Sequence, residues 1–152
     1  MKKRLISVFV MLLLPLLVVA RQRVIVDTDI DSDVDDAGTL AMLYTLHKQH
    51  KINLLGTIVT SDDPFAVTCV SAFNAYYGMG DLPLGFLEGQ SFLKNHSRYT
   101  RQISEEFPHD LPSWKDAETA TNTYRKLLAG SPNHSVVILT IGHLSSLQRL
   151  LQ

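Results

Sequence analysis

The chain has 152 residues, of which 45% are hydrophobic and 19% charged, and its formal net charge is −1. This is ordinary globular composition for one domain, and the near-neutral charge provides no basic surface for nucleic acid. A single cysteine, Cys69, excludes an internal disulfide.

The first twenty residues form a segment of their own. Lys2, Lys3 and Arg4 precede the apolar run LISVFVMLLLPLLVVA. A basic start, an apolar stretch and small residues at its end are typical of a secretory signal peptide. We therefore expect cleavage after Ala20, a secreted or periplasmic location, and no membrane attachment after cleavage. A membrane anchor is the alternative, although the run contains Pro15 and is short for a span of about 20 apolar residues.

Beyond Ala20, strand-like and helix-like segments alternate. RVIVD (23–27) predicts a short buried strand, and DDAGTLAMLYTLHK (35–48) has apolar residues at helical spacing. Further strands are expected at 52–60, 82–86 and 135–142, and further helices from Asp63 to about Tyr77, at 117–129 and from His143 onward. Residues 88–116 predict a long loop with short helical turns, either a binding loop or a surface excursion held by its aromatic residues.

This order of elements predicts an α/β domain over residues 21–152. Strands that alternate with helices favour an open, mostly parallel sheet with helices on both faces. The last predicted helix has no capping residue, glycine or polar tail before the sequence ends at Gln152. We therefore expect the chain to be the N-terminal part of a longer, truncated domain.

Six aspartates lie between Asp27 and Asp36, directly after the first predicted strand. In open α/β sheets, ligands bind beyond the carboxyl ends of the strands, which is where this cluster lies. Carboxylates this close repel one another and select a hard cation such as Ca²⁺ or Mg²⁺. Zinc is disfavoured because no histidine or cysteine is interleaved. The sequence therefore predicts a cation site at the end of the first strand.

Three other interpretations of the aspartates differ in how well they fit the sequence. A helix–loop–helix calcium loop is excluded, because its last ligand position falls on Gly38, Leu40 or Met42 and a strand precedes the loop. A Mg²⁺-dependent phosphatase of the haloacid dehalogenase type fits a strand followed by D-x-D, although that family usually continues with glycine; it is the enzyme alternative. An inactive remnant that binds a sugar or nucleoside is the non-enzyme alternative.

The segment VIVDTDIDSDVDDAGTLAML resembles the N-terminal signature of the inosine-uridine preferring nucleoside hydrolase family, with Asp31 where that family often has glycine. LLGTIVTSDDPFAVTCVSAFNAYYGMGDLPLGF and VVILTIGHLSSL resemble the next two blocks, in family order. The resemblance implies a Rossmann-like nucleoside hydrolase fold. It also implies hydrolysis of the N-glycosidic bond of a ribonucleoside, or another N-riboside, to ribose and free base.

Residue by residue, the resemblance implies a Ca²⁺ cofactor bound by Asp29, Asp36 and the backbone carbonyl of Ile141. Asp29 would also be the catalytic general base that activates the metal-bound water. The other implied roles are ribose contacts from Asp35 and Asp63 and support of the site by Asp27. Two alternatives remain: Asp35 as a helix cap, and Asp62 with Asp63 as an ordinary turn.

The family's later half supplies another calcium-binding aspartate and, in some members, a histidine that assists the departing base. Neither is located in these 152 residues. We therefore expect the chain alone to lack a calcium ligand and leaving-group activation. The resemblance leaves open whether the full-length form is a homo-oligomer, and it does not specify the preferred nucleobase.

Overall fold

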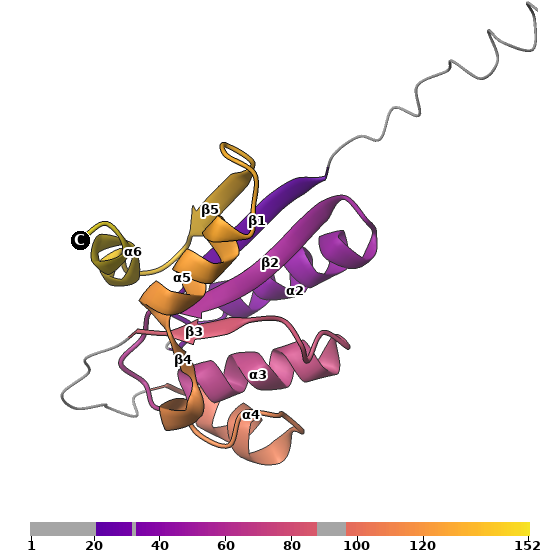
Figure 1. Cartoon of the computed structure of the whole chain (residues 1–152). Coiled ribbons are helices and arrows are strands. Elements are labelled where there is room, and N and C mark those ends of the chain that lie inside the picture. Colours follow the sequence, from indigo (N-terminus) through magenta and orange to yellow (C-terminus); the bar gives the residue numbers. More distant parts are fainter. Residues whose placement is uncertain (1–20, 32, 88–96) are drawn as a thin grey trace, which may run out of the picture.

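The computed structural model describes residues 21–31, 33–87 and 97–152. The predicted signal peptide, and residues 88–96 of the predicted loop, lie outside this part of the chain. Five strands form one sheet in which every pairing is parallel, with helices on both faces (Figure 1). The predicted α/β fold is confirmed. Within the described ranges, no helix has both the length and the apolar character needed to cross a membrane.

The elements follow the predicted order closely. The strands are β1 (Gln22–Thr28), β2 (Ile52–Val59), β3 (Leu84–Phe86), β4 (Glu118–Thr119) and β5 (Val136–Thr140). The helices are α2 (Asp35–Lys48), α3 (Ala66–Tyr76), α4 (Thr100–Glu106), the 3-10 turn η1 (Trp114–Asp116), α5 (Ala120–Ala129) and α6 (Ser145–Leu150). α4 and η1 are short helical turns within the predicted loop. β4 is a correction, since its residues were predicted to begin a helix.

The strand order places a crossover between β1 and β5. The sheet reads β4-β3-β2-β1-β5, so the chain moves outward from β1 to β4 and then returns to the other side of β1. β1 therefore pairs with both β2 and β5. In an open parallel sheet, the point where the strand order reverses forms a crevice beyond the carboxyl ends of two neighbouring strands. That point lies here between β1 and β5.

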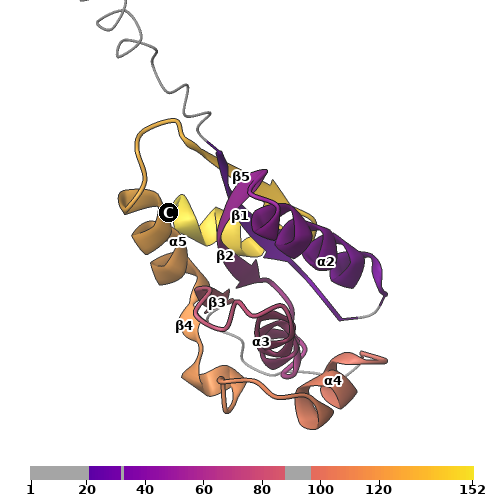
Figure 2. The same cartoon turned by 90° about the vertical axis from the view of Figure 1, so that its right-hand side faces the viewer.

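Alternate residues of β1 enter two separate layers, as the period of a strand requires. Val26 belongs to the core that α2 and α3 cover, whereas Ile25 packs with Tyr124 of α5 on the opposite face. Figure 2 shows α5 on the side of the sheet opposite α2. The alternation continues beyond Val26: Asp27 contacts α5, and Thr28 contacts α2. The end of β1 is thus held from both faces.

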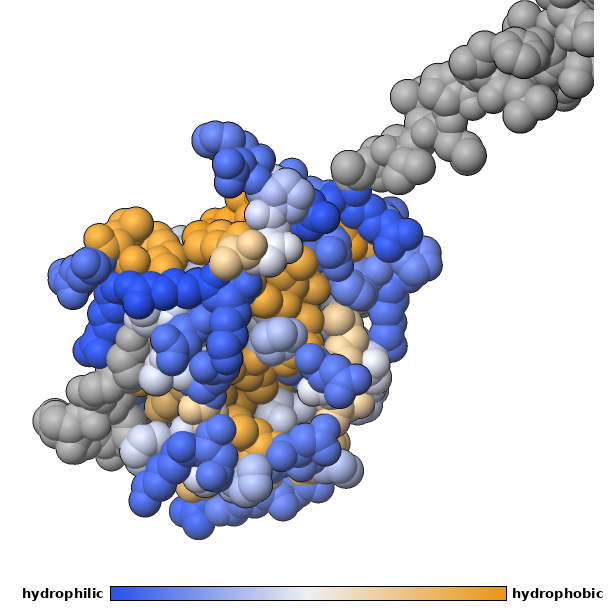
Figure 3. Space-filling model, in the orientation of Figure 1, coloured by the Kyte–Doolittle hydropathy of each residue, from blue (hydrophilic) through white to orange (hydrophobic). Residues whose placement is uncertain are grey.

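Apolar side chains reach the surface in the C-terminal part of the chain. Val137, Leu144 and Leu151 are 47%, 59% and 79% exposed. Figure 3 shows apolar surface over α6 and in a band beside α5. Exposed apolar residues of this kind are ordinary in globular proteins, so by themselves they mark no binding site.

Candidate functional site

An open cleft of about 640 Å³ lies beyond the carboxyl ends of β1 and β5. Aspartates from the segments after β1 and β2, together with two residues after β5, line it: Asp29, Asp31, Asp33, Asp35, Asp36, Asp62, Ile141 and His143. We call this space the acidic cleft. It lies at the point where the strand order reverses, which is where a ligand site is expected in such a sheet.

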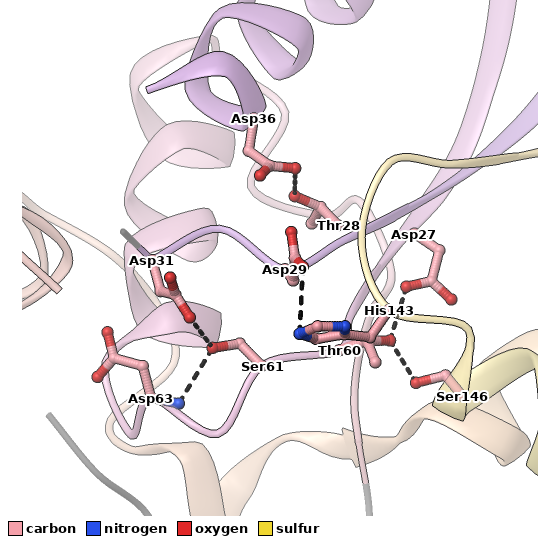
Figure 4. A network of polar contacts seen from close by, with 10 residues as sticks. All are labelled: Asp27, Thr28, Asp29, Asp31, Asp36, Thr60, Ser61, Asp63, His143 and Ser146. Atoms are coloured by element: carbon pink, nitrogen blue, oxygen red, sulfur yellow. Dashed lines mark hydrogen bonds and ion pairs between the residues drawn. The ribbon is translucent and has the colours of Figure 1, made fainter. Parts of the chain in front are cut away.

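Asp36 is the most buried carboxylate of the acidic cleft, with 4% of the residue exposed. Thr28, the last residue of β1, donates a 2.5 Å hydrogen bond from Oγ1 to Asp36 Oδ1 (Figure 4). Desolvation raises the pKa of Asp36 to about 6; the Thr28 hydrogen bond opposes this shift, whereas the charges of Asp29 and Asp35 add to it. The position therefore disfavours an uncompensated negative charge, which a bound cation would compensate.

Asp29 lies at the centre of the site, just after β1. Its Oδ2 lies 3.6 Å from His143 Nε2, and Figure 4 shows it between Thr28 and His143. The turn after β5 lies directly against it: a Cβ on Gly142 would lie 2.5 Å from Asp29 N and 2.7 Å from Asp29 Cγ. Only glycine permits this approach. The preceding residue, Ile141, donates from its N–H to the carbonyl of Asp27 at 2.8 Å, which fixes the turn to β1.

The exposed rim of the cleft carries a pair of interacting acids. One carboxylate oxygen from each of Asp33, Asp35 and Asp36 lies within 4.8 Å of the others. The hydrogen bond between Asp33 and Asp35 raises the pKa of Asp33 and lowers the pKa of Asp35. Val34 holds the N-cap position of α2, with no side-chain hydrogen bond. Asp35 is therefore not the N-cap of this helix, and its side chain faces the cleft.

The structure does not bring Asp63 to the residues that line the acidic cleft. Asp63 is fully buried; its Oδ1 accepts a 3.1 Å hydrogen bond from Phe65 N, and its Oδ2 accepts one from the Thr100 hydroxyl. These bonds form a turn before α3 and tie it to α4. Asp62 lines the cleft in its place. The contacts of Asp63 therefore fit the turn interpretation better than a ribose contact.

Asp27 also lies apart from the cleft, behind it, on the face that α5 covers. It is fully buried, and its carboxylate accepts 2.6 Å hydrogen bonds from the hydroxyls of Thr60 and Tyr124. Burial raises the pKa of Asp27, and the two hydrogen bonds oppose that shift. Figure 4 shows Asp27 directed toward Thr60 and away from Asp36. Its position allows it to support the site but not to contact a ligand in the acidic cleft.

Several cleft residues were not among the predicted site residues. Asp31 and Asp33 both line the cleft, and Asp31 Oδ2 accepts a 3.1 Å hydrogen bond from Ser61. The regular D-x-D-x-D-x-D spacing from Asp27 to Asp33 was the signal for them. His143 had no comparable signal, because a histidine at the start of a helix is ordinary.

The burial of Asp36 predicts a pH dependence of stability in metal-free protein. Its pKa of about 6 lies above its ordinary value of 3.8. The folded state therefore holds this proton more tightly than the unfolded state, and the stability that the protonated group contributes is lost as the pH rises from about 4 through about 6. The loss is at most about 3 kcal/mol. Urea unfolding in EDTA at pH 5 and pH 7.5 should detect about 1.4 kcal/mol of it, because part of the loss falls below pH 5. Asp36→Asn should reduce the difference, and an equal difference in both proteins would contradict the prediction.

No protein-family model matches the chain, and a search of the curated proteins found no match. The resemblance to nucleoside hydrolases therefore rests on the residues quoted above. The function has to be argued from the chemistry of the acidic cleft.

Proposed function

We propose that this chain carries the cation-binding part of a calcium-dependent N-ribohydrolase, which cleaves a ribonucleoside or another N-riboside into ribose and free base. One observation carries the proposal: carboxylates from two segments surround an open cleft at the β1/β5 crossover, and one of them, Asp36, is buried. Ca²⁺ binds about six to eight oxygen ligands, so a cleft rich in carboxylates suits it.

The donor set fits a hard cation. No ion pair within the described residues involves Asp36, although its burial raises its pKa to about 6. The one imidazole on the cleft belongs to His143, whose side chain is 77% exposed at the rim. Asp29, Asp36 and the carbonyl of Ile141 would hold the ion. Zinc, which prefers nitrogen and sulfur ligands, would find a poor site here.

The side chains of the cleft divide the chemistry among them. Bound Ca²⁺ would hold the two vicinal hydroxyls of a ribose and lower the pKa of a water ligand. Asp29 accepts the proton of the attacking water as general base, while the nucleobase leaves with the electron pair of the broken C–N bond and takes up a proton from solvent. Asp35, at the exposed rim, accepts a hydrogen bond from a ribose hydroxyl. The negative field of the other aspartates favours the positive charge that develops on the sugar in an oxocarbenium-like transition state.

The test separates calcium binding from catalysis in the complete gene product that contains this chain. Calcium at about 100 times its dissociation constant should stabilise the folded state by about 2.7 kcal/mol relative to EDTA, seen as a higher Tm. Chromatography should detect free base released from inosine or uridine, and EDTA should stop the release.

Three other outcomes contradict the proposal in different ways. If neither calcium nor EDTA changes the Tm, the protein has no calcium site. Calcium binding without base release favours a non-catalytic sugar or nucleoside site. Release of phosphate from a panel of phosphomonoesters, with Mg²⁺ and without nucleoside cleavage, favours the phosphatase alternative, whose D-x-D would begin at Asp27, within β1, or at Asp29, just after it.

A further inference from the structure

A buried network of hydroxyl groups lies behind the acidic cleft, and the chemistry above does not use it. Thr60, just after β2, donates a 2.6 Å hydrogen bond to Asp27 Oδ1, and Tyr124 of α5 donates one of the same length to Asp27 Oδ2. The Ser146 hydroxyl lies 2.5 Å from the Thr60 hydroxyl. Because Thr60 has one hydroxyl hydrogen and gives it to Asp27, Ser146 is the donor to Thr60. One carboxylate thus joins β1, α5, α6 and the end of β2.

The network is closed to bulk solvent and closely linked to the main chain of the site. At most 1% of each of the four residues is exposed, so bulk solvent does not compete for these bonds. The N–H of Thr60 donates to the carbonyl of Thr28 at 2.8 Å, and the N–H of Ile141 donates to the carbonyl of Asp27 at the same distance. Thr28 and Ile141, which these two bonds hold, are the neighbours of Asp29 and Gly142. The network therefore lies directly behind the backbone that positions Asp29 and the turn at Gly142.

We propose that Tyr124, Thr60 and Ser146 are positioning residues for the acidic cleft. Through Asp27 they hold the end of β1 against the end of β5, so that the Asp29 carboxylate and the Ile141 carbonyl face one ligand together. That the acidic cleft binds a ligand rests on the function proposed above. The physical reason is that apolar contacts alone leave a strand free to shift by a fraction of an ångström, whereas directional hydrogen bonds do not. Functional groups must be held within about 0.5 Å.

The chain offers a matched control for this role. Tyr44 of α2 is fully buried like Tyr124, and its hydroxyl donates a 2.7 Å hydrogen bond to Asn74 Oδ1. It packs in the core on the opposite face of the sheet and is not among the residues that line the acidic cleft. Tyr124→Phe and Tyr44→Phe therefore each delete one buried hydroxyl and one hydrogen bond to a side chain. Only the first deletion lies behind the site.

Amide hydrogen exchange in metal-free protein is the first measurement, because it needs neither calcium nor activity. Tyr124→Phe should speed exchange in the segments 27–31 and 141–146 by about tenfold, the effect of losing one buried hydrogen bond. Tyr44→Phe should leave both segments as in the wild type. Thr60→Val should act like Tyr124→Phe, and Thr60→Ser, which keeps the hydroxyl, should restore slow exchange.

Kinetics in the complete gene product give the second measurement. Tyr124→Phe should lower kcat about tenfold or more with less than about a threefold change in KM, because misplacing a reacting group costs rate more than binding. Equal exchange and equal kcat in Tyr124→Phe and Tyr44→Phe would overturn the positioning role while leaving the hydrolase intact. If Tyr124→Phe alone speeds exchange in the two segments, but the protein neither binds calcium nor releases base, the proposed function is overturned. The positioning of the two turns by the network would then still stand.

Discussion

Asp29→Asn is expected to slow the release of free base from inosine or uridine by at least about a hundredfold, the contribution of a positioned general base. Asparagine keeps the shape of the side chain but cannot accept the proton of the attacking water. The side chain is 27% exposed, so the substitution leaves no buried group unsatisfied and should not disturb the fold. The measurements are kcat at saturating calcium and the Tm in EDTA.

Asp81→Asn is the control for this loss of charge. Asp81 is exposed in the turn between α3 and β3, outside the residues that line the acidic cleft, so the substitution removes one negative charge far from the site. Its kcat should stay within a few-fold of the wild type. If Asp29→Asn also stays within a few-fold, Asp29 is not the base and the chemistry proposed for the cleft fails at its central residue.

Gly142→Ala is expected to destabilise the folded state by about 1–3 kcal/mol and to abolish calcium binding. The new Cβ would lie 2.5 Å from Asp29 N and 2.7 Å from both Asp29 Cβ and Cγ. These are main-chain and stem atoms, which cannot rotate away as the end of a long side chain can. The turn after β5 must therefore move off Asp29, and the carbonyl of Ile141 moves with it. Urea unfolding in EDTA and the calcium-induced shift in Tm measure the two effects.

Gly38→Ala makes the same chemical change where there is room. A Cβ on Gly38, within α2, would meet no atom within 4 Å. Alanine is the better helix former, so this variant should be more stable than the wild type by up to about 1 kcal/mol and should bind calcium normally. A Gly142→Ala protein that matches Gly38→Ala in both measurements would show that the close approach to Asp29 has no importance for the site.

The parts of the fold that could be predicted are those whose signal is local. α2 has the predicted bounds, Asp35–Lys48, because its apolar residues recur at helical spacing over the whole element. β1 and β5 were predicted from runs of β-branched residues, and the ends of each strand lie within two residues of the predicted ones. The parallel order of the sheet followed from the alternation of strands and helices, which permits few other arrangements.

Two elements depend on contacts that no local pattern shows. β4 has two residues, Glu118–Thr119, and it is a strand because it pairs with Gly85 and Phe86 of β3. α4, with the sequence TRQISEE, gives only Ile103 to the core, which is too sparse to show a helical period. α4 lies within the segment 88–116 and β4 just after it, where polar residues and two prolines weaken every sequence signal.

The candidate site divides in the same way. Asp29, Asp35, Asp36 and Ile141 were predicted together and line one cleft, because strand ends of a parallel sheet share an edge. Of the adjacent pair Asp62 and Asp63, the structure directs Asp62 to the cleft and Asp63 into the turn, a choice that the sequence pattern does not show. The partners of Asp27 could not be predicted. Tyr124 lies 97 positions after Asp27 in the sequence, and its spacing within its helix is that of an ordinary core residue.

The position of the acidic cleft between the first and the last strand also bears on the order of folding. The aspartates after β1 are present early in the sequence, but the turn that faces them is placed only when β5 docks. Joining segments so distant in sequence has a large loop-closure cost, so we expect the turn after β5 to settle against Asp29 only after the rate-limiting barrier. Contacts formed after the rate-limiting barrier slow unfolding and leave the folding rate unchanged. An ion bound there would therefore slow the separation of β1 from β5 without speeding their pairing.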